Sequence, residues 1–399
     1  MLAMSKIVIS PTKLTVIKNN MTSWSDRIKP QPMFDVLSLA KIRESSGNYV
    51  ARMEIGDTPG FHNAYMHELV TKYSASPFRY SPSRGETILI KKVLETQWPN
   101  YSEENIVIGP ANFLITASLA SVTSQGDLVL LPDPGFASYK LSADFLGLKI
   151  AYYPVYKDGN PSFPDLGELV RSLDKRPKVV VVNNPSNPLG IAFDSTLVLS
   201  SLKDLPDLGV EIVFDETYIN LVYDETSVEL NDFPGLRIRS FSKEHCAPGL
   251  RIGYASAEPE LAGVMADLMS LSISCVPQFI QFAVADYLGS QESLRFTSFL
   301  RAEMSRRFKY VSNTLPTNVL KTSANAAFYS LLDTGKINGE EAFRFLLERN
   351  VSTCPGSKFG ENSINSVRVS LAGDSQLFEK DIDMLNSGIN DLLEMQNSN

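Results

Sequence analysis

Short apolar runs rich in valine, isoleucine and leucine recur through the middle of the chain, and they constrain its fold more than any other feature. They read "NIVIG" (105–109), "DLVLLPD" (127–133), "LKIAYYPV" (148–155), "KVVVVNN" (178–184), "VEIVFDE" (210–216), "LRIRSF" (236–241) and "RIGYAS" (251–256). Several are continuous rather than alternating, which is typical of strands covered on both faces. Helix-like segments such as "FLITASLASVTS" separate many of them. This alternation predicts an α/β fold with a mostly parallel sheet flanked by helices.

The strand rhythm fades after about residue 260. Helical segments, two shorter strand candidates ("AAFYSLL" and "SVRVSLA") and a closing helix follow, and the N-terminal part offers one helix around "MFDVLSLAKIRES". We therefore expect a large domain over 51–290 and a smaller α+β domain over 291–399. Residues 1–50 form an N-terminal segment that we expect to pack with the small domain.

Composition excludes several classes of partner. The 399 residues carry a net charge of −8 with no long run of one sign, which argues against nucleic acid or an anionic membrane as a partner. The first residues lack the pattern of a secretory signal, and no apolar run is long enough to span a membrane. Three scattered cysteines and three histidines indicate no disulfide framework and no metal site, and they fit a cytoplasmic protein.

Polar and charged residues gather where the predicted strands end. In open parallel sheets, ligands bind beyond the carboxyl ends of the strands. Asp215 and Lys243 each follow an apolar run, and the turn "NNPSNPLG" follows another. A helix opens just after Gly109, and Phe136 follows the run that ends at 133. We therefore expect these groups to surround one ligand.

One type of ligand uses all of these groups, namely a phosphorylated aromatic aldehyde. Its phosphate suits a helix N-terminus, where free backbone N–H groups favour an anion, and Arg251, Ser240 and Ser242 can add hydrogen bonds. Lys243 can form a Schiff base with the aldehyde, and Asp215 can hold a ring nitrogen protonated. Pyridoxal 5'-phosphate has this chemistry, so we expect it as the cofactor.

Four motifs carry a resemblance to a known family: "NNPSNPLG", "DETY", "SFSKEHCAPGLRIGY" and "VRVSLA". In this order and at these intervals, the chain resembles the class I/II aminotransferases, which are fold-type I pyridoxal-phosphate enzymes. The resemblance runs from about Ile55 to about Leu392. It implies that Lys243 binds the cofactor and then acts as general base and acid.

The resemblance assigns further cofactor contacts. It implies that Asp215 pairs with the pyridinium nitrogen and that Tyr218 and Asn187 hydrogen-bond the 3'-oxygen, with a cis Asn187–Pro188 bond. Pro110 has no N–H, so phosphate contacts are expected from the amides of Ala111 and Asn112. Phe136 either stacks on the ring or packs under the sheet.

The resemblance also implies substrate and partner contacts. Arg368 would grip the α-carboxylate of the substrate with a bidentate fork, with Gly56 and Asn187 beside it. Tyr80 would reach the cofactor phosphate of a neighbouring subunit, which implies a homodimer with active sites at the interface. We expect His245 and Cys246, next to the lysine, to serve in packing.

The function that follows is transamination between an L-amino acid and a 2-oxo acid by a ping-pong mechanism, in amino acid metabolism or biosynthesis. The alternative is another fold-type I reaction (a lyase, decarboxylase, cyclising synthase or oxidase), because fold alone does not fix function. A third hypothesis is that the protein is a non-catalytic amino-acid sensor. No second substrate-gripping arginine can be picked out, so the sequence leaves the amino donor open.

Overall fold

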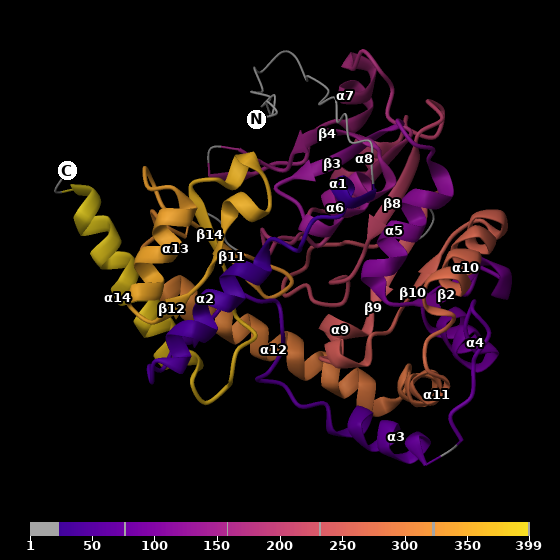
Figure 1. The fold of residues 1–399 in the computed structure, drawn as a ribbon, viewed down its shortest axis with the longest axis horizontal. Coiled ribbons are helices and arrows are strands. Elements are labelled where there is room, and N and C mark those ends of the chain that lie inside the picture. The colour runs from indigo at the N-terminus through magenta and orange to yellow at the C-terminus, as the bar shows by residue number, and fades with distance from the viewer. Residues whose placement is uncertain (1–23, 76, 158, 231–232, 321–323, 398–399) are drawn as a thin grey trace.

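The structure is a computed structural model that describes residues 24–397 except 76, 158, 231–232 and 321–323. The first 23 residues of the predicted N-terminal segment lie outside the described residues. Figure 1 shows a magenta sheet region and an orange-to-yellow C-terminal part side by side, with indigo helix α2 alongside the C-terminal part.

Seven strands form the central sheet in the order β2-β10-β9-β8-β7-β3-β4. Their bounds are β2 Ile106–Gly109, β3 Leu128–Asp133, β4 Lys149–Pro154, β7 Val179–Asn183, β8 Glu211–Asp215, β9 Leu236–Ser240 and β10 Gly253–Ser256. From β4 to β9 all neighbours are parallel, whereas β10 runs antiparallel to both β9 and β2. The mostly parallel sheet predicted from the sequence is therefore confirmed.

Both faces of this sheet are buried, which explains the continuous apolar runs. In β7, Val179 and Val181 join the core that includes residues of α5 (Ala111–Val122), α10 (Pro259–Ile273) and α11 (Gln278–Tyr287). Val180 and Val182 face the opposite core, with α7 (Leu166–Ser172) and α8 (Ser195–Leu202). Because successive side chains of a strand point to opposite faces, covering both faces requires an apolar residue at every position.

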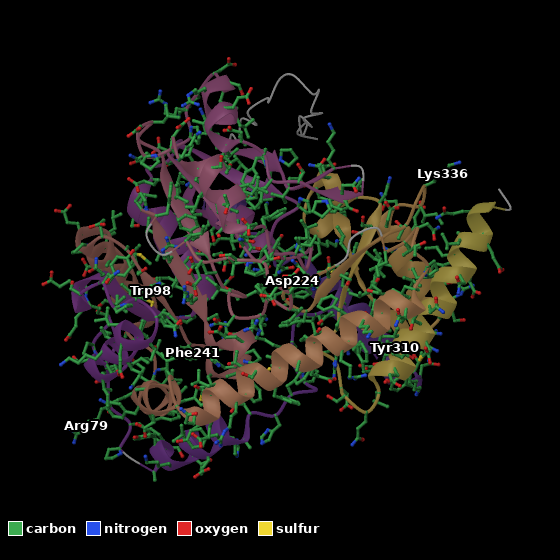
Figure 2. The ribbon with its side chains drawn as sticks, turned by 180° about the vertical axis from the view of Figure 1, so that it is seen from behind. Arg79, Trp98, Asp224, Phe241, Tyr310 and Lys336 are labelled. Atoms are coloured by element: carbon green, nitrogen blue, oxygen red, sulfur yellow. The ribbon has the colours of Figure 1, made fainter. Side chains whose placement is uncertain are left out.

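The C-terminal part holds a second, three-stranded antiparallel sheet in the order β11-β14-β13. Its strands are β11 Tyr329–Asp333, β13 Cys354–Pro355 and β14 Ser366–Ser370, and its helices are α13 Gly339–Glu348 and α14 Phe378–Asn397. The long helix α12 (Gln291–Thr314) leads into this part. Figure 2 shows Tyr310 where α12 meets α14, and its hydroxyl donates to Asp383 of α14 at 3.1 Å.

The N-terminal segment bridges the two parts. Helix α1 (Trp24–Arg27) contacts α6 (Ala137–Leu146) beside the large sheet. Helix α2 (Met33–Ser45) lies at the predicted place, and Arg43 at its end donates to Asn350 Oδ1 at 2.7 Å. Strand β1 (Ala51–Arg52) then pairs in parallel with β12 (Val351–Ser352). The segment thus spans from one part of the molecule to the other.

The remaining elements lie around the large sheet. They are helices α3 Ala64–Ser74, α4 Thr87–Thr96 and the short α9 Phe241–Glu244, and the hairpin strands β5 Tyr156–Lys157 and β6 Asn160–Pro161. Helix α3 packs against α11, and α4 also contacts α11. Within residues 24–397, as far as they are described, no helix is both long and apolar enough to cross a membrane.

Candidate active site

A cavity of about 590 Å³ lies at the carboxyl ends of β7, β8 and β9, and residues of the C-terminal sheet and of α2 also line it. It brings together every sequence-predicted site residue except Tyr80. These are Gly56, Ala111, Asn112, Phe136, Asn187, Asp215, Tyr218, Ser240, Ser242, Lys243, Arg251 and Arg368. Gly56 and Arg368, which are 312 positions apart in the sequence, therefore line the same cavity. The strand-end argument predicted that Asp215 and Lys243 meet there, and the family resemblance implied the same for Gly56 and Arg368.

Asp215 ends strand β8 and is buried. Its Oδ2 accepts a 2.6 Å hydrogen bond from the Tyr139 hydroxyl, and its Oδ1 accepts from the hydroxyl (2.6 Å) and the amide (3.1 Å) of Thr217. Burial raises the pKa of Asp215 above its ordinary value, although the hydrogen bonds from Thr217 and Tyr139 act in the opposite direction. A cation placed beside this carboxylate would favour its ionised form.

Tyr139 is a contributor that the sequence reasoning missed. It lies in α6, three residues after Phe136, so that both side chains come from the first turn region of one helix and both line the cavity. Burial and the neighbouring Asp215 raise its pKa well above the usual value, so it is a hydrogen-bond donor at neutral pH. Its position makes it an orienting partner for Asp215.

Replacing Tyr139 with phenylalanine is expected to weaken cofactor binding roughly 10- to 100-fold, because a hydrogen bond to a charged group is worth about 1.5–3 kcal/mol. Loss of the donor also raises the pKa of Asp215 further, so the acid limb of the kcat/KM profile should move to higher pH. Fluorescence titration with the cofactor and a pH–rate profile measure both effects. Tyr153→Phe is the control, because the Tyr153 hydroxyl donates to the Val181 carbonyl at 2.8 Å in the core. If the pH–rate profile of Tyr139→Phe matched that of the wild type, the orienting role of Tyr139 would be contradicted.

Lys243 lies in the short helix α9, directly beyond the end of β9. Its Nζ donates to the Gly56 carbonyl and lies 5.8 Å from the centre of the Phe328 ring. The Ser240 hydroxyl caps the helix by accepting from the amide of Ser242 at 3.1 Å. The local sequence Ser-Phe-Ser-Lys thus turns the chain at the strand end and presents a half-buried amine to the cavity.

The buried Glu216 connects the ends of β8 and β9. Its carboxylate pairs with Arg237 Nη1 at 2.5 Å and with Arg239 Nε at 2.8 Å. Burial alone would raise the pKa of Glu216, but the two guanidinium groups hold it below its ordinary value. Because Glu216 follows β8 and both arginines belong to β9, this cluster fixes the ends that carry Asp215 and Lys243 relative to each other.

Groups that can bind an anion also line the cavity. Ala111 and Asn112 open helix α5, and the first amides of a helix have no intrahelical acceptor. The hydroxyls of Ser240 and Ser242 and the guanidinium of Arg251 join them. Together with the acid and the lysine described above, this donor set fits a phosphorylated pyridine aldehyde, because the cavity offers donors for a phosphate, an amine for an aldehyde and a carboxylate for a ring nitrogen.

Arg368 occupies the side of the cavity formed by the C-terminal sheet, and it is buried. Its Nη1 donates to Asn187 Oδ1 at 3.0 Å and its Nη2 to the Glu54 carbonyl at 2.7 Å. The guanidinium carbon lies 4.4 Å from the centre of the Tyr329 ring and 4.7 Å from that of Phe359. Stacking and hydrogen bonds thus orient the fork. The Asn187–Pro188 bond is cis.

Tyr329 is a second contributor that the sequence reasoning missed. Its hydroxyl lies 2.9 Å from that of Tyr218 and faces Gly56 so closely that a Cβ at Gly56 would come within 1.9 Å of it. Only glycine fits there, which gives the predicted Gly56 a concrete role in packing. Burial and Tyr329 together raise the pKa of Tyr218 well above its usual value.

His245 and Cys246 make packing contacts, as expected. The His245 ring stacks on Phe241 with centroids 5.2 Å apart and meets Tyr287 edge to face. Burial raises the pKa of Cys246 to about 12, which leaves the thiol protonated and unreactive at neutral pH. Tyr80 lies outside the cavity and is 87% exposed in the single chain.

Comparison with known proteins agrees with this site. The family model for aminotransferase class I and II matches residues 79–384. The (5-formylfuran-3-yl)methyl phosphate transaminase of Methanocaldococcus jannaschii is 27% identical over 90% of this chain and 96% of that protein. A probable aspartate aminotransferase of the same organism is 29% identical over 75% of this chain and 83% of its own length. A Thermus thermophilus aspartate aminotransferase double mutant has the same fold, with a TM-score of 0.85 at 22% identity, covering 93% of this chain and 100% of that one.

The fold and the site together define a pyridoxal-phosphate-dependent enzyme of fold type I. The chain belongs to the aminotransferase class I and II family. It is therefore an aminotransferase, a transferase that moves amino groups between amino acids and oxo acids with pyridoxal 5'-phosphate as its cofactor.

Proposed function

We propose that Lys243 binds the cofactor covalently and, once a substrate amine has displaced it, carries the proton that transamination moves. Pyridoxal phosphate, when bound, supplies an aldehyde carbon that amines attack in turn and a ring that accepts electrons from the substrate's α-carbon. The observation that carries this role is the convergence of Lys243, Asp215 and Arg368 on one cavity. The contact of Nζ with the Gly56 carbonyl supports it, because this places the amine on the substrate side.

Asp215 holds the cofactor's ring nitrogen protonated in this proposal. The carboxylate is buried, and Tyr139 and Thr217 orient it from both oxygens. Tyr218 and Asn187 bind the ring's 3'-oxygen, and Phe136 stacks on the ring. The phosphate is bound by the amides of Ala111 and Asn112, the hydroxyls of Ser240 and Ser242, and Arg251. All of these residues line the cavity.

Arg368 binds the α-carboxylate of the substrate, with Asn187 and the Gly56 backbone beside it. Its partners support this role, because the Asn187 amide and the Glu54 carbonyl hold the guanidinium in one orientation, and Nε has no acceptor among the residues that the structure describes. A planar fork matches a carboxylate by two parallel hydrogen bonds.

Replacing Arg368 with lysine is expected to raise KM for the amino donor roughly 10- to 100-fold. Lysine keeps the positive charge but cannot form two parallel hydrogen bonds to a carboxylate, and a charge-assisted hydrogen bond is worth about 1.5–3 kcal/mol. Steady-state kinetics measure the effect. Arg306→Lys changes an exposed arginine of α12 in the same way and should leave KM unchanged. An Arg368→Lys enzyme with the KM of the wild type would assign the carboxylate to another group.

Transamination is separated from the alternative chemistries by a single-turnover experiment. The enzyme is mixed with an amino donor but no oxo acid, and the released oxo acid is measured. A ping-pong aminotransferase stops after one equivalent per active site, because a second donor cannot react until an oxo acid has accepted the amino group of the first. Continued product formation without an acceptor would favour a lyase, decarboxylase or oxidase instead.

We infer a homodimer in which Tyr80 contacts the cofactor phosphate of the partner subunit. The exposure of Tyr80 on the single chain supports this inference. Three large apolar side chains are also exposed there, namely Phe78, Leu271 and Ile273. Light scattering after size-exclusion chromatography is expected to give twice the mass of one chain. A monomeric mass for the active enzyme would exclude the shared site.

The cellular location of the protein and the boundaries of its domains are also proposals. A cytoplasmic location is inferred from the free state of Cys246, Cys275 and Cys354. The division of the chain near 50 and 290 is supported by separate hydrophobic cores, although Ala51 and Met53 pack with the C-terminal core. Limited proteolysis of the holoenzyme should cleave between these cores before it cleaves within them.

A further inference from the structure

Arg307 is a buried cation to which the proposed function gives no task. It lies in α12, one turn before Tyr310, which Figure 2 labels, and 0% of its surface is exposed. Its guanidinium carbon lies 4.7 Å from the centre of the Phe61 ring and 4.5 Å from that of Phe378. A buried cation is costly unless hydrogen bonds satisfy it. The acceptors of Arg307 therefore indicate which parts of the chain it holds together.

Three acceptors of this guanidinium belong to the segment 371–375. They are the carbonyls of Leu371 (2.6 Å) and Gly373 (2.8 Å), which accept from Nη1, and the hydroxyl of Ser375 (2.7 Å), which accepts from Nη2. Glu303, one turn earlier on α12, accepts from Nε at 2.8 Å and balances the charge. Because the segment follows directly on β14, Arg307 fixes the end of the strand that carries Arg368.

Ser375 extends this contact to the segment that follows Gly56. Its hydroxyl accepts from Arg307 and donates to the Gly60 carbonyl at 3.1 Å. The Gly60 amide in turn donates to the Ala372 carbonyl at 3.4 Å. We call Arg307, Ser375 and Gly60 the clasp, because these three residues join the chain beyond β14 to the chain beyond Gly56.

The two backbones that the clasp joins lie close together. A Cβ on Gly60 would come within 2.0 Å of the Gly373 carbonyl oxygen, so a side chain there would push the backbones apart. Phe61, the next residue, is buried, and its ring lies against the Arg307 guanidinium. Gly60 and Phe61 thus fix the course of the chain after Gly56.

A second anchor lies on the other side of Gly56. The Met53 carbonyl accepts from the amide of Ser370, the last residue of β14, at 2.8 Å. Residues 55–59 therefore span the distance from this anchor to the clasp. Because both ends of the span are attached to the strand that carries Arg368 or to its continuation, the clasp helps to set the position of Gly56 relative to Arg368.

We propose that Arg307 is a positioning residue for the substrate carboxylate, and that it acts through the clasp by holding Gly56 at a fixed place relative to Arg368. This inference rests on the proposed function, in which Arg368 and the Gly56 backbone bind the α-carboxylate. A displacement of about 1 Å in such a site can lower a rate by about 100-fold. Loosening of the clasp should therefore weaken recognition of a carboxylate and leave reactions at the cofactor itself unchanged.

Two alkoxyamines that differ by a carboxylate separate this role from a purely structural one. Aminooxyacetate and methoxyamine both attack the aldehyde carbon of the cofactor, but only aminooxyacetate has a carboxylate. Absorbance of the holoenzyme gives the rate constant per reagent concentration for each. In Arg307→Gln the ratio of the two constants is expected to fall at least about 10-fold, because only aminooxyacetate reacts more slowly. Arg306→Gln changes the exposed neighbour on α12 and should keep the wild-type ratio.

Arg368→Lys serves as the reference, because it changes the proposed carboxylate-binding group itself. A ratio that falls in Arg368→Lys but not in Arg307→Gln would overturn the role of the clasp and leave the proposed function intact. Equal slowing of both reagents in Arg307→Gln would show a general structural role and would overturn the inference as well. An unchanged ratio in Arg368→Lys would instead remove the proposed role of Arg368, and this inference with it.

A matched pair of glycine substitutions tests the clasp without removing a buried charge. Gly60→Ala inserts a methyl group against the Gly373 carbonyl oxygen, whereas a Cβ on Gly373 meets no atom of the described residues within 4 Å. The ratio of the two rate constants is expected to fall several-fold in Gly60→Ala and to keep the wild-type value in Gly373→Ala. Should Arg307→Gln fail to fold, this pair decides, and equal ratios in the two glycine variants would overturn the proposal.

Discussion

Replacement of Lys243 with alanine is expected to lower kcat by roughly 10⁴-fold or more. A positioned general acid–base group contributes about 10²- to 10⁴-fold by itself, and this lysine is also proposed as the group that binds the cofactor. Among the described residues, the other cations that line the cavity are Arg251 and Arg368, and a guanidinium group does not serve as a proton acceptor in proteins.

Steady-state kinetics of purified Lys243→Ala with a panel of donors and 2-oxoglutarate measure this loss. Lys140→Ala is a suitable control, because Lys140 is more than half exposed on α6 and pairs with Asp144 away from the cavity. A variant that retained turnover within tenfold of the wild type would remove Lys243 from the mechanism. A regulatory amino-acid sensor is excluded by the expected result, since a sensor has no turnover to lose.

Replacement of Asp215 with asparagine is the second large effect we expect. Asparagine keeps the shape but cannot pair with a protonated ring nitrogen. Breaking a buried charge pair costs about 3–5 kcal/mol. At about 1.36 kcal/mol per tenfold change, kcat/KM should fall by at least roughly 10²-fold. Asp204→Asn changes a partly exposed carboxylate that pairs with Arg171 and does not line the cavity, so it should have no effect.

The Asp215→Asn variant is expected to lose activity without losing stability. Burial raises the pKa of Asp215 in the folded chain above its unfolded value. Between those two pKa values the folded state binds more protons than the unfolded state, so this group makes the free energy of unfolding fall as pH rises. Removing the carboxylate should therefore not lower the melting temperature of the cofactor-free protein at neutral pH. Unfolding of Asp215→Asn under those conditions would show that the carboxylate is structural.

Local patterns were enough to predict the sheet and to place Asp215 and Lys243 at its strand ends. The continuous run Val179–Val182 predicts a strand covered on both faces, and the structure confirms it. Asp215 and Lys243 follow two such runs, and parallel strands bring their carboxyl ends to one edge. Neither inference required knowledge of contacts between distant segments.

Contacts made by the fold were not predictable in this way. Nothing in the spacing of Tyr139 and Asp215, 76 residues apart, indicates their 2.6 Å hydrogen bond. Likewise Tyr329 reaches Gly56 only because the C-terminal sheet packs over the cavity. The antiparallel direction of β10 relative to β9 and β2 also escaped prediction, because a short apolar run such as "RIGYAS" does not indicate the direction of a strand.

The covalent attachment of the cofactor tests the central claim most directly. The purified protein is incubated with pyridoxal 5'-phosphate, reduced with borohydride, digested and analysed by mass spectrometry. We predict one modified peptide per chain, with the phosphopyridoxyl group on the ε-nitrogen of Lys243. Modification at another lysine, or a chain that stays unmodified, would contradict the account.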